Sequence, residues 1–194
     1  MGVLLLGTST EERLMARYAA GDDVAFGQLF ALLAPQLRAF FLRSFVDPAV
    51  ADDLTQSTFL RLHRGRASYR PDLPLKPWVF TMAACERRDE LRRRYRLPAH
   101  AGEVELEQAE PTSPERPPND GPYSGYEIEA VKEALKHLPE SQRVVLHLHL
   151  HDELTYEQIA QVLGTTPGAV RVRASRAYER LRAELKSYLG RREA

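Results

Sequence analysis

The chain of 194 residues contains a single cysteine, Cys85, and a single tryptophan, Trp78. One cysteine excludes a disulfide framework and a multi-cysteine zinc cluster within the chain, and this fits the reducing cytoplasm. Long hydrophobic runs are also missing, because no stretch approaches the roughly 20 apolar residues that span a bilayer. The opening run, MGVLLLGTST, is too short for a signal peptide and lacks its basic residues. We therefore predict a cytoplasmic protein without membrane insertion.

The chain also has no excess of charge of either sign, because 27 Lys and Arg residues balance 27 Asp and Glu residues. That balance conceals a segregation. Residues 99–129 contain eight acids and one base, Arg116, so this segment carries −7 and the rest of the chain carries +7. Residues 98–125 are rich in Pro, Glu, Gly and Ser and have no sustained apolar period. We predict a flexible acidic linker there, between domains at residues 1–97 and 126–194.

Helical periodicity dominates residues 1–97, and capping residues mark the expected helix starts. Ser9 and Glu12, for example, have the spacing of a capping box. The expected helices are Thr10–Ala20, Val24–Phe45 capped by Asp22 or Asp23, Pro48–Arg64, and one from Leu75 or Lys76 to Arg96. Pro35 is expected to interrupt or kink the second of these helices.

Residues 126–194 continue the helical pattern. The expected helices are Tyr126–His137, Glu140–His151 with Pro139 in a first-turn position, Tyr156–Leu163 capped by Thr155, and a long helix capped by Thr166 that reaches about Tyr188. Gly164 follows Leu163 as the expected C-terminal stop. A short helix, a glycine turn and a capped longer helix predict a helix-turn-helix unit. The fold class is therefore predicted to be all-α, with two small helical domains.

The long C-terminal helix has two different sides. At 100° per residue, small and apolar residues share one side, namely Val170, Ala174, Ala177 and Leu181. The opposite side and its flanks carry arginines and a serine, which bind phosphates and base edges in protein–DNA complexes. A simpler alternative is that these arginines only solvate the surface of a helix.

The segment Leu154–Arg182, LTYEQIAQVLGTTPGAVRVRASRAYERLR, resembles region 4 of sigma factors of the extracytoplasmic-function (ECF) group. The preceding ALKHLPESQRVVLHLH is similar to the helices that lead into that region. The family uses this domain to hold the −35 promoter element. The resemblance implies five candidate contacts to DNA: Thr166, Arg171, Arg173, Ser175 and Arg176. Val172 departs from the family pattern, which usually has a small polar residue at that position.

Three histidines alternate with leucines in the run LHLHLH. On a helix, His147 and His151 are four residues apart and can hold a metal ion in principle, whereas His149 points elsewhere. The only candidates for a third ligand are Asp152 and His137. We predict helix-edge histidines without a ligand role, and neither a metal nor another cofactor.

The segment ADDLTQSTFLRLHR, residues 51–64, resembles the part of sigma factors that docks on the clamp helices of the RNA polymerase β′ subunit. Leu54, Ser57 or Thr58, and Leu62 are expected to face the home domain. The resemblance implies a polymerase-binding face made by Asp52, Asp53, Gln56 and Phe59. The alternative is a plain amphipathic helix with acids near its positive N-terminal end.

Residues 76–96, KPWVFTMAACERRDELRRRYR, resemble the part of region 2 that opens the promoter at the −10 element. Residues 66–75 align with the family's loop that captures a flipped-out −10 base, although their extra prolines depart from its pattern. A charged face with an embedded aromatic suits single-stranded DNA, because rings stack on bases. The implied −10 contacts are Ser68, Tyr69, Arg70, Lys76, Phe80, Arg87 and Arg88. Trp78 and Cys85 lie on the apolar stripe, where packing is the simpler role.

Two motif sets, in the order and spacing of ECF sigma factors, predict an alternative sigma factor that directs promoter-specific initiation. Its implied partners are core RNA polymerase (β′ clamp helices and β flap), promoter DNA and an anti-sigma factor. No Walker loop, nucleophile triad or clustered carboxylate pair is present, so we predict no enzymatic activity. The alternatives are a stand-alone helix-turn-helix transcriptional regulator and a sigma-mimicking decoy for an anti-sigma factor.

Overall fold

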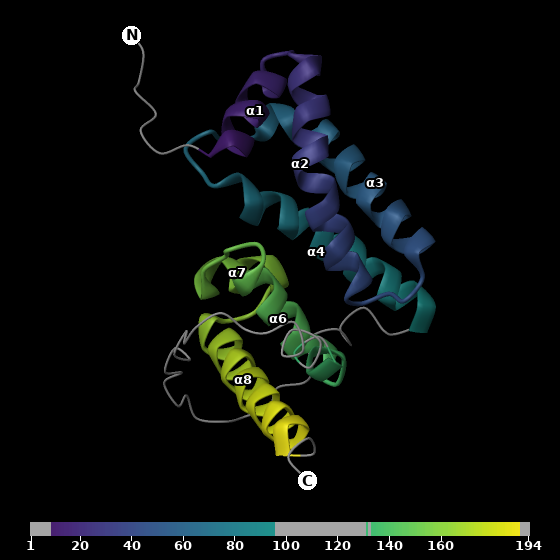
Figure 1. The fold of residues 1–194 in the computed structure, drawn as a ribbon. Helices are drawn as coiled ribbons and strands as arrows, with labels where there is room; N and C mark the ends of the chain where they lie inside the picture. The colour runs from purple at the N-terminus through teal and green to yellow at the C-terminus, as the bar shows by residue number, and fades with distance from the viewer. Residues whose placement is uncertain (1–8, 96–130, 132, 191–194) are drawn as a thin grey trace. The chain divides into compact units, whose positions relative to one another are not determined.

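The computed structural model describes residues 9–95, 131 and 133–190 (Figure 1). The chain divides into two compact units, Met1–Val104 and Glu105–Ala194. Within the described ranges every regular element is a helix, as predicted. The predicted linker and half of the predicted helix Tyr126–His137 lie outside the described residues, although Val131 and residues 133–136 are helical.

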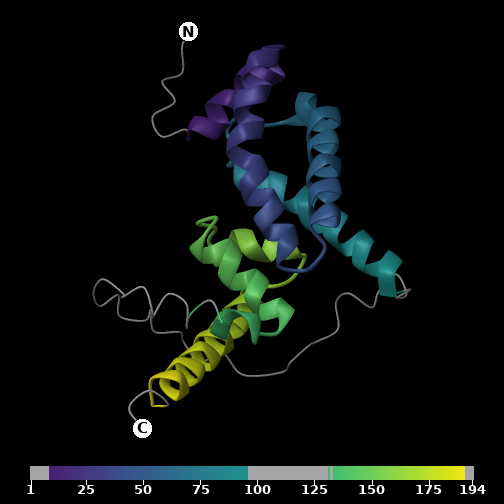
Figure 2. The same cartoon turned by 45° about the vertical axis from the view of Figure 1, so that its right-hand side comes forward.

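The N-terminal unit is a bundle of helices that pack in the order of the chain. Its elements are α1 (Thr10–Ala19), α2 (Asp23–Leu42), α3 (Pro48–Gly65), the 3-10 helix η1 (Arg66–Ser68) and α4 (Leu75–Tyr95). Figure 2 shows α2 between α1 and α3, and α4 packs against α3. The helix starts lie within one residue of their predicted places, because they depend on local capping.

The start of the unit illustrates this local control. The Ser9 hydroxyl accepts a hydrogen bond from the Glu12 amide (3.2 Å), and the Glu12 carboxylate accepts one from the Ser9 amide (2.7 Å). The predicted capping box is therefore confirmed. Of the two candidate caps for α2, Asp22 is the one used, since its carboxylate lies 3.1 Å from the Ala25 amide.

Helix α2 supplies much of the core of this unit. Its buried residues are Ala25, Leu29, Leu33, Leu37, Phe40 and Phe41. The helix continues through Pro35, so the predicted interruption is wrong, while the alternative, a kink at Pro35, stays a prediction. The proline ring is exposed, while Leu33 and Leu37 are fully buried on either side of it and hold the helix in place. Helix α2 is also long and apolar enough to cross a membrane, by length and composition only. This differs from our expectation that no stretch of the sequence would meet that test. The core helices of soluble proteins pass the same test, and the buried residues of α2 form a stripe typical of such a helix.

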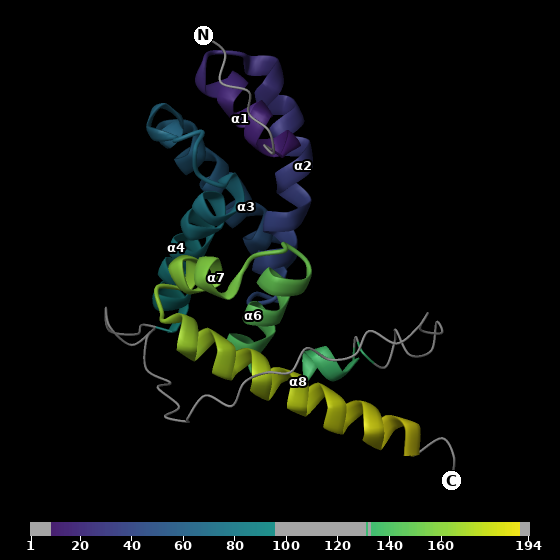
Figure 3. The same cartoon turned by 90° about the vertical axis from the view of Figure 1, so that its left-hand side faces the viewer.

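The C-terminal unit contains α6 (Glu140–Leu150), α7 (Tyr156–Leu163) and α8 (Pro167–Gly190). Helix α8 packs against both of the others, as Figure 3 shows. The LHLHLH run lies on α6, and its buried residues include Val144, Val145, Leu146 and Leu148. This helix is therefore buried on two sides, as predicted. Pro139 is the N-cap of α6 and lies just before the first turn.

Candidate nucleic-acid interface

A tight turn between α7 and α8 positions the candidate −35 residues. It starts at Gly164, whose φ of 67° lies in the left-handed region that glycine adopts without steric cost. Thr155 caps the start of α7 through a capping box. The Thr166 hydroxyl accepts a hydrogen bond from the Ala169 amide (3.2 Å) and so caps α8. The short-range signals seen in the sequence thus build the helix-turn-helix geometry.

The buried side of α8 is thin. Val170, Ala174 and Ala177 have no exposed surface, and Leu181 is half-buried. Ala177 packs with Leu138 and Leu146 in one apolar cluster. Small side chains allow a close approach of the neighbouring helices, and this directs the opposite side of α8 outward, as predicted.

The outward side of α8 carries polar groups with weak local partners. Arg171 Nη2 lies 2.6 Å from Glu157 Oε1 on α7, and both side chains are about half exposed. The Ser175 hydroxyl donates to Glu179 at 3.3 Å. Two further candidates are half-buried: Arg173 and Arg176. An exposed ion pair contributes less than about 1 kcal/mol, so Arg171 can exchange Glu157 for a phosphate at little cost.

The loop after α3 presents only part of its predicted −10 set at the surface. Ser68 and Arg70 are exposed, and Arg70 forms an ion pair with Asp72 at 2.7 Å. The hydrogen bond from Arg70 holds the pKa of the Asp72 carboxyl below its usual value. Tyr69 is only 8% exposed, its ring packs on Trp78 (5.4 Å between centroids), and burial is the main cause that raises its pKa to about 12. Tyr69 therefore supports the loop from beneath.

The prediction that Phe80 lies on the DNA-facing side of α4 is wrong. Phe80 has no exposed surface, and its ring meets Phe40 of α2 edge-on, at 5.6 Å and 80°. The buried stripe of α4 is two rows wide, because α2 offers large rings that fill the space beside it. The buried apolar residues of α4 are Leu75, Val79, Phe80, Ala83 and Ala84. Ala84, on the same side of α4 as Phe80, also belongs to this core.

The cationic candidates of α4 lie at the edges of that stripe. Lys76, Arg87 and Arg88 are half-buried. Arg87 Nε donates to the Ser44 hydroxyl at 2.6 Å. Cys85, expected in the apolar interior, is also half-buried.

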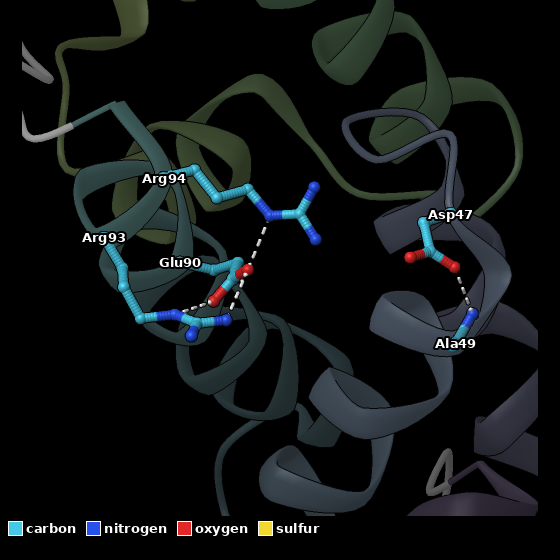
Figure 4. A network of polar contacts seen from close by, with 5 residues as sticks. All are labelled: Asp47, Ala49, Glu90, Arg93 and Arg94. Atoms are coloured by element: carbon cyan, nitrogen blue, oxygen red, sulfur yellow. Dashed lines mark hydrogen bonds and ion pairs between the residues drawn. The ribbon is translucent and has the colours of Figure 1, made fainter.

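A polar network near the end of α4 was not predicted from the sequence. Glu90 is 7% exposed and accepts hydrogen bonds from Arg93 (2.8 Å) and Arg94 (2.6 Å), as Figure 4 shows. The Arg94 guanidinium also lies over the Phe45 ring, 5.2 Å from its centroid. The sequence contained a signal for this network, because Arg93 and Arg94 follow Glu90 by three and four residues. Side chains at these spacings meet on one side of a helix.

Glu90→Gln tests this network. The hydrogen bond from Arg93 lowers the pKa of Glu90, so the ionised form contributes stability at neutral pH. That contribution is lost as the pH falls below the ordinary glutamate range, about 4.3. We expect Glu90→Gln to reduce the free energy of unfolding by about 1 kcal/mol at pH 7 and by much less near pH 3. Urea unfolding followed by Trp78 fluorescence measures both values, with Asp89→Asn as the control; equal losses at the two pH values would contradict the assignment.

The start of α3 carries the candidate polymerase-binding residues. Asp47 caps the helix through the Ala49 amide (3.0 Å; Figure 4). Asp52, Asp53 and Gln56 are exposed, and Asp52 forms an ion pair with Arg38 of α2 at 2.6 Å. The inward residues agree with the expectation, since Leu54, Thr58 and Leu62 are all buried.

Phe59, which we predicted in the docking face, is only 4% exposed, so that prediction is wrong. Its ring packs against Phe30 (4.5 Å) and Phe26 (6.1 Å) of α2. Thr55, Phe59 and Leu62 are spaced by four and three residues and form a second buried row beside Thr58.

The three histidines of α6 have different surroundings. His147 is buried with its Nε2 atom 3.5 Å from the Asp152 carboxylate, and its ring stacks on that of His151 (4.9 Å). His149 turns elsewhere, with Nδ1 2.9 Å from the Leu154 carbonyl oxygen. Among the residues that the structure describes, no group of three or more His, Cys, Asp and Glu side chains is arranged to hold a metal ion.

The sequence matches two family models in the order in which these units occur. Residues 29–97 match sigma-70 region 2, and residues 128–181 match sigma-70 region 4. The chain is 34% identical over 168 residues to the RNA polymerase sigma factor CarQ of Myxococcus xanthus, a match that covers 87% of this chain and 93% of CarQ. It is 31% identical over 183 residues to the ECF RNA polymerase sigma factor SigM of Mycobacterium tuberculosis, which covers 93% of this chain and 86% of SigM.

Solved structures give the same result. The structure of CnrH in complex with the cytosolic domain of CnrY matches with a TM-score of 0.62 and 25% identity, over 92% of this chain and 99% of that one. The sigma factor RpoE in complex with the anti-sigma factor NepR, from Bartonella quintana, matches with a TM-score of 0.60 and 28% identity, over 83% and 96%. Both helical modules, their order and these relatives lead to one conclusion: the chain belongs to the extracytoplasmic-function sigma factors of the sigma-70 family.

Proposed function

We propose that this chain binds core RNA polymerase in the cytoplasm and directs it to promoters, with separate surfaces for the −35 element, the −10 element and the polymerase. The observation that carries the proposal is the presence of both sigma modules in one chain, in family order. A stand-alone helix-turn-helix regulator has no use for the N-terminal module. The task is one of binding and strand opening, without catalysis by the chain itself.

The −35 element is the proposed ligand of α8. Its outward side carries Arg171, Arg173, Ser175 and Arg176 within two turns, and Thr166 lies at its start. An arginine reads guanine through two parallel hydrogen bonds and also neutralises phosphates. The thin alanine side lets α7 and α6 support the helix while its outward side enters the major groove.

The −10 element is the proposed ligand of the loop and of the exposed edge of α4. With Phe80 in the core, the polar candidates that carry this role are Ser68, Arg70, Lys76, Arg87 and Arg88. Extruding a base costs a few kcal/mol, which contacts to the flipped base must offset. Tyr69 and Trp78 pack against each other and support the loop without themselves contacting DNA.

Core polymerase is the proposed partner of the exposed acids on α3, at the β′ clamp helices, while the C-terminal unit meets the β flap. Asp53→Arg reverses one of these charges on the exposed face. We expect core affinity to fall by about tenfold or more, because the reversed charge no longer complements the surface that the acid is proposed to contact. A fluorescence titration with core enzyme measures the change, and Asp89→Arg, an exposed reversal on α4, is the matched control. An equal loss in both variants would assign the effect to net charge alone.

An anti-sigma factor is the proposed regulator. RpoE was solved with the anti-sigma factor NepR, and CnrH with the cytosolic domain of CnrY. This similarity supports a partner that masks one or both modules of the present chain until a signal arrives.

Transcription reconstituted from purified chain and bacterial core enzyme tests the whole proposal. We expect initiation at a defined set of start sites on genomic DNA, with shared −35 and −10 sequences upstream. If the chain is a stand-alone regulator, it should instead bind duplex DNA tightly as a dimer without polymerase. If the chain is a decoy, it should bind an anti-sigma factor and should not support initiation with core enzyme.

A further inference from the structure

Both ends of the loop at residues 66–74 are tied to α1. In Figure 1 the teal segment between α3 and α4 passes beside this helix, which contacts both η1 and α4. Helix α1 precedes residues 29–97, which match sigma-70 region 2. The sigma-70 region 2 model therefore does not itself cover the α1 side of these contacts.

The first tie lies where the loop begins. The Tyr18 hydroxyl is hydrogen-bonded to His63 Nδ1, and Arg66 lies over the Tyr18 ring, 5.9 Å from its centroid. Arg66 Nη1 donates to His63 Nε2 (3.2 Å) and to the His63 carbonyl oxygen (2.9 Å). Because arginine only donates, His63 Nε2 must accept, so in a neutral ring Nδ1 carries the proton and donates to Tyr18. Tyr18, which is 3% exposed, thereby orients the ring that orients Arg66.

The second tie lies where the loop ends. Glu12 Oε2 accepts from the Ser9 amide within the capping box, while Oε1 accepts from the Leu75 amide at 3.4 Å. The Leu75 amide belongs to the first turn of α4, where backbone donors have no partner within their own helix. The pKa of Tyr69 reflects the same proximity, since the charge of Glu12 adds to burial in raising it to about 12.

We propose that α1 is a positioning element for the −10 loop, in which Tyr18 and Glu12 hold the two ends of the loop at the separation needed to receive the extruded base. Neither residue is proposed to contact DNA. Tyr18 acts through His63 and Arg66, and Glu12 acts through the first turn of α4. This inference rests on the proposed function of the loop and assigns a role to a helix that the sigma-70 region 2 model does not cover.

Two conservative variants remove one tie each. Glu12→Gln keeps an N-capping side chain but offers one acceptor oxygen where the carboxylate offers two, so the capping box and the Leu75 bond compete. Tyr18→Phe removes the hydroxyl and keeps the ring beneath Arg66. Glu11→Gln makes the same charge change in the same turn of α1 and is the matched control.

The experiment compares these full-length variants with core enzyme on a promoter fragment recovered by start-site mapping. One template is fully duplex, and the other is premelted across the −10 element. Loss of one hydrogen bond predicts a roughly three- to tenfold slower opening of the duplex and a similar loss of discrimination against a substituted −10 base. On the premelted template we expect wild-type initiation rates and wild-type core affinity, with Tm lowered by only a few degrees, as loss of one hydrogen bond predicts. The double variant should be slower than either single variant.

Three outcomes are decisive against the inference. Wild-type opening and wild-type base discrimination in both variants would remove the role of α1 and leave the proposed function intact. Equal losses on both templates, with a lower Tm, would mean that α1 only stabilises the fold. Failure of the wild-type chain to initiate on any template would instead remove the proposed function on which the inference rests.

Discussion

Replacing Phe80 with alanine is expected to lower the free energy of unfolding of the N-terminal unit by about 3–5 kcal/mol, the usual cost of deleting a buried phenylalanine ring. Phe80 has no exposed surface and packs edge-on against Phe40. Urea unfolding followed by the fluorescence of Trp78, the only tryptophan of the chain, reports on this unit alone. Because native domains are stable by about 5–15 kcal/mol, a loss of this size should also reduce the yield of folded protein.

Phe30→Ala is the matched control for this measurement. Its ring is 41% exposed and rests on Phe59 and Phe26, so we expect a loss of about 1 kcal/mol. A Phe80→Ala protein with wild-type stability and a specific defect in promoter opening would restore the stacking role that the sequence pattern favoured.

Arg176→Ala is expected to reduce promoter-specific initiation roughly 5- to 150-fold, the equivalent of about 1–3 kcal/mol for loss of an arginine that reads a base edge. The defect should appear in the affinity of the polymerase complex for its promoter, and affinity for core enzyme should stay within about twofold of wild type. Run-off transcription at increasing promoter concentration separates the two effects. The loss should shrink when the base pair that Arg176 contacts is replaced.

Arg182→Ala removes the same charge from an exposed position six residues, or about 1.7 turns, further along α8. In this variant we expect at most a small loss of promoter affinity, equal for all DNA sequences. The affinity should also depend less steeply on salt concentration. Since Arg176 is half-buried, Tm is measured for both variants. Equal defects in the two variants would mean that α8 attracts DNA by charge alone, without reading its sequence.

Much of the fold follows from short-range chemistry that the sequence displays directly. The Ser9–Glu12 capping box, the Thr155 cap and the left-handed Gly164 depend on residues within four positions of one another. The alanine side of α8 was equally readable, because a helix places every third or fourth residue on one side. These features position the candidate −35 residues.

The predictions that proved wrong concern residues whose surroundings are set by segments distant in the sequence. Phe59 and Phe80 each lie beside an apolar stripe, and periodicity alone placed them outside it. They are buried because α2 contributes Phe26, Phe30 and Phe40, which widen the core on both sides. Pairing between helices, which no local pattern specifies, decides such positions.

The ties between α1 and the −10 loop belong to the same class. Tyr18 and His63 lie 45 residues apart, and Glu12 and Leu75 lie 63 apart. No spacing rule links them, so only the three-dimensional structure reveals that one helix holds both ends of the loop.

The proposed function requires that the chain act on DNA only as a part of RNA polymerase. To test this, the purified chain, free of any inhibitor, is mixed with bacterial core enzyme at low salt, and both association and promoter binding are followed. We expect a stable complex that binds promoter fragments in preference to unrelated DNA, while the isolated chain binds both only weakly. Absence of association with core enzyme, or tight sequence-specific binding by the isolated chain, would contradict the proposed function.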